Sequence, residues 1–312
     1  MDGQSLTQEL ADILREDRTT SGFLRKQASY RWLYEAAIEL TRRTQSVGTY
    51  TTLTTVANQR NYTLPANFLW VYLKNQRNEY FLKYNDGTND YFITWKDYDA
   101  IIAANQTTSV SIPSRFCITD YQQVAALITG TATSDGTLSN EESYLIDSTA
   151  PFENVSIGDD VHNTTSSSDG IVIWASSSSQ ILTALFSSTS ASDYWATSDA
   201  YVIVPQGRQQ IYLDPPPSTS GHTIRVEYIA KPTPVYSPYR QYRFNDNLNA
   251  ALVRYAAWLY KYRDREPNYG DGFFKYFEME CAKAVKQSGR TLNRSSFKVN
   301  FTKRSFSNRS YR

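Results

Sequence analysis

The 312-residue chain has little of the chemistry that metal sites and disulfide frameworks require. It contains two cysteines, Cys117 and Cys281, and two histidines, His162 and His222. Two cysteines so far apart do not make a disulfide framework, and we expect both thiols to be buried packing groups under reducing conditions. Because a zinc site needs three or four ligands at suitable spacing, we expect neither a metal nor a cofactor.

The groups that enzymes use are also scarce. We find no glycine-rich phosphate loop and no nucleophile elbow. Asp159 and Asp160 are neighbours on a predicted strand and would point to opposite faces, which disfavours shared acid–base work. Asp97 and Asp99 fall in the first turn of a predicted helix, where the helix dipole alone explains them. We therefore predict that the chain is not an enzyme.

Long apolar runs are missing as well. No segment approaches the roughly 18 apolar residues of a membrane-spanning helix. The N-terminus, Met1-Asp2-Gly3-Gln4, lacks the basic start and apolar stretch of a secretory signal. We expect no contact with a membrane.

Acidic residues are absent from residues 289–312, which carry seven Lys or Arg. The rest of the chain holds 25 basic against 31 acidic side chains, so a body of about −6 ends in an arm of +7. Lys and Arg are in turn absent between Tyr121 and Gly207. Runs of like charge repel one another and usually bind something outside their own domain.

The arm also alternates between apolar and polar residues. Phe297, Val299 and Phe301 alternate with polar residues, which is typical of an extended strand that buries one face against a partner. We interpret residues 289–312 as an extended docking arm. A disordered tail and a nucleic-acid-binding tail are the alternatives.

Helical periodicity marks both ends of the chain. Ser5 and Gln8 have capping-box spacing, and a second helix is predicted from Ser21 to Arg43. A helix from about residue 245 is followed by a break at Pro267, Gly270 and Gly272 and then by a second helix ending near residue 289, which predicts an antiparallel pair.

Between the helices the pattern is β. Strands separated by turn signals such as Asn85-Asp86-Gly87 are predicted before residue 120, with a short helix from Thr94 to Ala104, and strands return after residue 208. Residues 121–207 are rich in Ser and Thr and show five or six short strands, with Asp169-Gly170 at one plausible turn, which predicts a small inserted sandwich or barrel.

The predicted fold class is therefore α+β. A helical body built from the N-terminal helices and the C-terminal helix pair carries β-hairpins and the inserted all-β domain. The predicted domains are a discontinuous domain of residues 1–120 and 208–288, the inserted domain of residues 121–207, and the arm of residues 289–312.

Taken in order, these pieces resemble a tailed-bacteriophage head-to-tail adaptor (connector) protein. The resemblance is carried by Tyr62-Thr63-Leu64-Pro65-Ala66-Asn67-Phe68, by Pro113-Ser114-Arg115-Phe116, by Ile211-Tyr212-Leu213-Asp214-Pro215-Pro216, by the strand Ile224–Tyr228 and by the final helix pair. The insertion, which such adaptors often lack, is similar to a β module of phage virion proteins in Ile157–Asn163 and Ser198–Ile203.

The resemblance implies a structural virion protein at the head–tail neck, assembled in the host cytoplasm. It implies a homo-oligomeric ring, commonly of twelve copies, that binds the portal above and a tail or nozzle protein below, while double-stranded viral DNA passes without specific binding. The C-terminal segment would reach the portal through these residues: Arg290, Arg294, Phe297, Lys298, Val299, Phe301, Lys303, Arg304, Phe306, Arg309, Tyr311 and Arg312.

Two other functions remain open. Trp174, Tyr194 and Trp195 lie in the Ser/Thr-rich insertion and would suit a carbohydrate- or receptor-binding module, because aromatic rings on a β surface can stack on sugars. A tail-tube or baseplate component is the second alternative.

Overall fold

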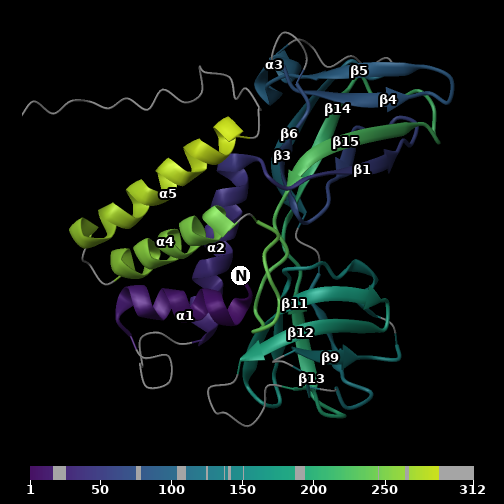
Figure 1. The fold of residues 1–312 in the computed structure, drawn as a ribbon. Coiled ribbons are helices and arrows are strands. Elements are labelled where there is room, and N and C mark those ends of the chain that lie inside the picture. The colour runs from purple at the N-terminus through teal and green to yellow at the C-terminus, as the bar shows by residue number, and fades with distance from the viewer. Residues whose placement is uncertain are drawn as a thin grey trace, which may run out of the picture.

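The computed structural model describes residues 1–16, 26–74, 79–103, 110–123, 126–136, 138–139, 142–149, 151–186, 194–244, 246–263 and 267–287. These residues form five α-helices and 15 strands, and the strands make two sheets. Figure 1 shows the four long helices gathered in one layer, with both sheets beside it. The predicted fold class is wrong, because the described protein is mostly β and is not an α+β fold with a helical body.

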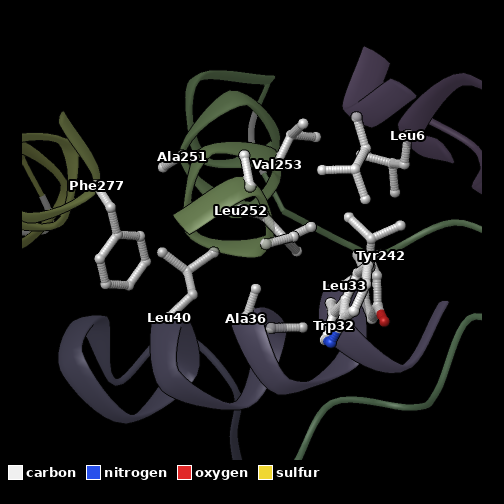
Figure 2. Packing of buried hydrophobic residues seen from close by; sticks show 14 of the residues in the cluster. Leu6, Trp32, Leu33, Ala36, Leu40, Tyr242, Ala251, Leu252, Val253 and Phe277 are labelled. Atoms are coloured by element: carbon white, nitrogen blue, oxygen red, sulfur yellow. The ribbon is translucent and has the colours of Figure 1, made fainter. Parts of the chain in front are cut away.

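Four helices form the helical layer: α1 (Gly3–Leu14), α2 (Lys26–Thr44), α4 (Asp246–Arg263) and α5 (Pro267–Gln287). Figure 2 shows that side chains from all four point into one apolar core. Leu6 of α1, Leu33 of α2, Leu252 of α4 and Phe277 of α5 are fully buried there. Burial of these apolar faces stabilises the layer by about 25 cal/mol per Å² removed from water.

The ends of these helices differ from the prediction. Helix α1 is capped by Asp2, whose Oδ1 accepts a hydrogen bond from the Ser5 amide at 2.8 Å, so the expected capping box at Ser5 is wrong. Helix α5 begins at Pro267 and contains both Gly270 and Gly272, so the two glycines that were expected to break the helix lie inside it. Proline is tolerated in the first helical turn, where its missing N–H has no intrahelical partner.

The first sheet has eight strands and curls into a nearly closed barrel. Its strands run in the order β1-β15-β4-β5-β6-β14-β2, and β3 also pairs with β15. The side chains of Leu82, Tyr84, Ile93, Ile224 and Val226 fill its interior. The strands are β1 (Gly48–Thr54), β2 (Asn61–Thr63), β3 (Phe68–Val71), β4 (Phe81–Asn85), β5 (Asp90–Trp95), β6 (Arg115–Gln123), β14 (Arg208–Asp214) and β15 (Thr223–Ala230).

Helix α3 (Tyr98–Ala103) packs on β6 of the barrel. It begins four residues later than predicted, because Thr94 and Trp95 complete strand β5.

The second sheet has seven strands in the order β7-β13-β10-β11-β12-β9-β8 and forms a half-barrel. Leu145, Val161, Trp195 and Ile203 are fully buried in its core. In place of the expected small sandwich or barrel, these residues form a single sheet curled into a half-barrel. The strands are β7 (Ile128–Thr131), β8 (Leu138–Ser139), β9 (Glu142–Ile146), β10 (Asp160–Asn163), β11 (Ser168–Ser177), β12 (Gln180–Phe186) and β13 (Ala200–Val204), with a 3-10 helix at Pro151–Asn154.

The turn expected at Asp169-Gly170 lies four residues earlier. Residues 164–167 form the turn, and Asp169 and Gly170 belong to β11. Strands β6 and β14, which precede and follow the half-barrel in sequence, pair with each other in the barrel, with Ile118 opposite Ile211. The division into domains stays a prediction.

Residues 231–244, here called the joint segment, connect the barrel to α4 and touch all three parts of the protein. Tyr236 packs with Tyr30 of α2 and with Ile171 and Ala184 of the half-barrel. Tyr242 lies in the core of the helical layer. The joint segment therefore links the half-barrel to the helices by apolar contacts.

Polar contacts strengthen this junction. Arg240 binds the carboxylate of Glu142 in β9 through Nε and Nη2, and its carbonyl accepts a hydrogen bond from the Gly3 amide at 2.8 Å. A side chain at position 3 would meet the carbonyl oxygen of Ser237, because a Cβ built on Gly3 lies 2.2 Å from that atom. Glycine is therefore required where α1 meets the joint segment.

Candidate docking surfaces

The predicted docking residues, from Arg290 to Arg312, all lie outside the described residues. The structure does fix the helix from which the arm departs. Arg43 of α2 binds Glu278 of α5 at 3.2 Å, and its guanidinium lies over the rings of Phe274 and Phe277 at 5.4 and 5.3 Å. Helix α5, which precedes the arm in sequence, is thus fixed to α2 near its middle.

A second surface was not predicted from the sequence. The outer side of the barrel exposes Tyr50 of β1 and Phe92 of β5, with 59% and 63% of each residue accessible to water. Lys83 of β4 and Arg225 of β15 lie between these strands. We call these four residues, together with Phe81 and Glu227, the barrel face.

Strand register brings the barrel face together. Arg225 lies opposite Thr52 of β1 on one side and Lys83 of β4 on the other, and Lys83 lies opposite Phe92. Directly paired residues point to the same face of a sheet. The alternate residues, among them Ile224, are buried inside the barrel. The face therefore exists only once four strands from distant parts of the sequence are aligned.

The rings of the barrel face are held in place. The Arg225 guanidinium lies 4.3 Å from the centroid of Tyr50, and Phe81 and Phe92 make an edge-to-face contact with centroids 5.2 Å apart. Glu227 binds Arg225 at 3.1 Å and Lys83 at 3.8 Å. Side chains ordered before binding lose little conformational entropy when a partner covers them.

The charged side chains of the half-barrel are acidic. The sequence between Tyr121 and Gly207 contains ten Asp or Glu and no Lys or Arg. Asp135, Glu153, Asp160 and Asp169 are exposed on it. Since this stretch contains no Lys or Arg, these cations can reach its carboxylates only from elsewhere in the chain or from a partner.

Several carboxylates are internal structural groups. Asp214 is fully buried and binds both Arg60, at 3.0 Å, and Arg115, at 2.5 Å. Asp159 is buried and accepts hydrogen bonds from the amides of Ser156 and Gln206, and burial raises its pKa despite these bonds. Asp160, its neighbour, is exposed. The two carboxylates therefore lie in different environments, although Asp159 precedes β10 and only Asp160 belongs to the strand.

At Asp147 the hydrogen bonds outweigh burial, so its pKa shifts in the opposite direction to that of Asp159. Burial acts to raise its pKa, but hydrogen bonds from Tyr201 Oη at 2.6 Å and from the hydroxyl and amide of Thr149 lower it overall. Its ionised form is therefore the one that the fold accommodates.

Both thiols are buried, which confirms the prediction for them. Burial raises the pKa of Cys117 to about 11 and that of Cys281 to about 12. The histidines are far apart and each has a local partner: His162 Nδ1 lies 2.7 Å from Asp169 Oδ1, and His222 Nδ1 lies 2.6 Å from Tyr84 Oη.

The three aromatic residues singled out in the insertion do not form one platform. Trp195 is fully buried, and its indole N–H donates to Thr183 Oγ1 at 2.9 Å. Trp174 and Tyr194 are exposed. Of the three residues, Trp195 therefore belongs to the core, and only Trp174 and Tyr194 are available at the surface.

No helix in the described part of the chain is long and apolar enough to span a membrane. Among the same residues, no cluster of three or more His, Cys, Asp or Glu side chains could hold a metal ion. In comparisons with known proteins, no family model matches the chain. A search of curated proteins gives no match either.

Proposed function

We propose that this chain is a structural protein of a tailed-bacteriophage virion, a connector subunit that forms a ring below the portal. The arm would dock on the portal, and a later tail or nozzle protein would bind on the far side. The observation that carries the proposal is the separation of charge: a body of about −6 is followed, after a helix fixed by Arg43, by an arm of +7 with alternating apolar residues.

The arm chemistry suits a protein partner. Its seven cations would pair with acidic groups of the portal, while Phe297, Val299, Phe301 and Phe306 would be buried against it. Exposed ion pairs contribute only about 0–1 kcal/mol each, whereas a buried aromatic ring contributes about 1.5–3 kcal/mol. We therefore expect the phenylalanines to supply most of the affinity and the cations to guide orientation.

Deletion of residues 290–312 tests the proposal. We expect the truncated protein to keep its fold, measured by circular dichroism, and to lose co-sedimentation with portal-bearing heads. A control with the arm residues in scrambled order keeps the charge and removes the alternation, and it should also fail. Replacement of Phe297 and Phe301 by Ser should weaken attachment more than replacement of any single Arg. Normal attachment of the truncated protein would contradict the proposal.

The ring would also have to let DNA pass. An acidic channel repels phosphate groups and would allow the genome to slide. The net charge of the body supports this part of the proposal, and a channel lined mainly by Lys and Arg in the assembled ring would contradict it.

A second function is favoured by one observation. Trp174 on β11 is 51% exposed, and an exposed indole on a sheet can stack on a sugar ring. Binding of the full chain to a glycan array, with loss of binding in Trp174→Ala, would support a carbohydrate-binding role for the half-barrel.

A further inference from the structure

The barrel face has the composition of a protein-binding surface. Aromatic residues and Arg are enriched at the centres of protein interfaces, and Tyr50, Phe92 and Arg225 are gathered on one sheet face. Glu227 offsets much of the positive charge of Arg225 and Lys83. That compensation disfavours a nucleic-acid strand, which would bring one phosphate charge per nucleotide onto the face.

A suitable partner must cover two exposed rings and offer a carboxylate to the positive charge that Glu227 leaves uncompensated on Arg225 and Lys83. The half-barrel has both features. It carries exposed carboxylates without a single Lys or Arg, and it also exposes Trp174, Leu127 and Val204. Two barrel faces placed against each other would instead bring the same cations together.

We propose that the barrel face binds the half-barrel of a second copy of this chain. Such a contact is heterologous, because the surface that one copy offers differs from the surface that the other uses. Every dimer then keeps one unused barrel face and one unused half-barrel, so addition continues, and the assembly closes into a ring when the rotation between neighbouring copies divides a full turn. This inference rests on the proposed ring and names the contact that builds it.

Rigidity of the subunit supports closure. The joint segment holds the half-barrel to the helices through Tyr236 and through the Arg240–Glu142 pair. These contacts hold the half-barrel surface in place relative to the helices of the same copy. A fixed angle between consecutive contacts is what a closed ring of defined size requires.

Cross-linking of the full-length protein tests the contact directly. A carbodiimide joins a lysine amine to a carboxylate only when the two groups touch. In a mixture of ¹⁵N-labelled and unlabelled protein, we expect links between Lys83 of one copy and Asp160 or Asp169 of another. Inter-chain links confined to other surfaces would overturn the inference.

Charge reversal provides the second test. The double variant Arg225→Glu, Lys83→Glu should weaken self-association by about tenfold or more, and Phe92→Ser by about thirtyfold, as for a typical interface hot spot. Adding Asp160→Lys and Asp169→Lys to the double variant should restore association. Lys275→Glu, on an exposed position of α5, is the matched control and should have no effect.

The outcomes separate this inference from the proposed function. If wild-type rings form and the double variant assembles equally well, the contact is wrong while the ring stands. If the wild-type protein forms no ring even with portal-bearing heads, both are wrong. Binding of a single-stranded oligonucleotide to the barrel face, in place of a second copy, would also overturn the inference.

Discussion

Replacement of Tyr236 by Ala should detach the half-barrel from the helical layer. Tyr236 is 7% exposed, and its ring lies 5.8 Å from Tyr30 and 5.8 Å from Phe186, measured between centroids. Removal of a large buried aromatic costs about 3–5 kcal/mol, and each lost ring pair contributes about 0.5–1.5 kcal/mol beyond the buried area. We expect the free energy of unfolding to fall by about 3–4 kcal/mol.

Urea unfolding followed by tryptophan fluorescence measures the total loss, and hydrogen–deuterium exchange shows where it occurs. Peptides from β11 and β12 should lose protection before those from α4. Tyr239→Ala is the matched control, since Tyr239 lies three residues further along the joint segment and is 66% exposed. Equal losses in the two variants would refute the view that Tyr236 holds the half-barrel in place.

Two further comparisons test the packing and the charges. Gly3→Ala should destabilise the protein by about 1–3 kcal/mol, because the clash with Ser237 outweighs the gain of up to about 1 kcal/mol in helix propensity. Gly272→Ala is the control, since a Cβ at this position of α5 meets no other atom within 4 Å. Thermal unfolding of this variant should show the gain in helix propensity alone. Asp147→Asn should cost about 1.5–3 kcal/mol at pH 7, because a buried charge-assisted acceptor of Tyr201 is lost. The pKa of Asp147 in the folded protein lies below the ordinary value of 3.8, so its contribution to the free energy of unfolding is present above pH 3.8 and is lost as the pH falls through the folded pKa. Denaturant unfolding between pH 2 and 7 should show this loss in the wild type and not in Asp147→Asn. The same pH profile in both proteins would contradict the assignment.

Helices were the easier part to predict. The apolar residues of α4 recur at helical spacing, so local sequence alone placed them on one face. Gly270 misled the prediction because glycine usually weakens a helix. Here a Cβ at that position would lie 3.1 Å from Trp258 Cδ1, so glycine permits the close approach of α4 and α5.

The sheets were harder, because their partners are distant in sequence. Strand β1 pairs with β15, so Gly48 lies opposite Ile229, and no local pattern specifies that pairing. Strong helical periodicity at both ends of the chain therefore dominated the fold prediction, although strands are more numerous. The barrel face was missed for the same reason: Tyr50, Lys83, Phe92 and Arg225 come from four strands and meet only through register.

The charge of the half-barrel is the feature that the fold itself does not explain. Oppositely charged pairs across strands stabilise a sheet, and like charges destabilise it, so a few lysines on the exposed side would favour folding. Asp160 and Asp169 nevertheless lie on neighbouring strands of a half-barrel that contains no Lys or Arg, and the partner of Asp169 within the sheet is His162, whose Nδ1 lies 2.7 Å from Asp169 Oδ1. We propose that this excess of negative charge serves contacts outside the sheet. In the proposed ring, the barrel face of a second copy would be attracted to this charge, whereas passing DNA would be repelled by it. Acidic side chains that close such a ring would not be available to line its channel.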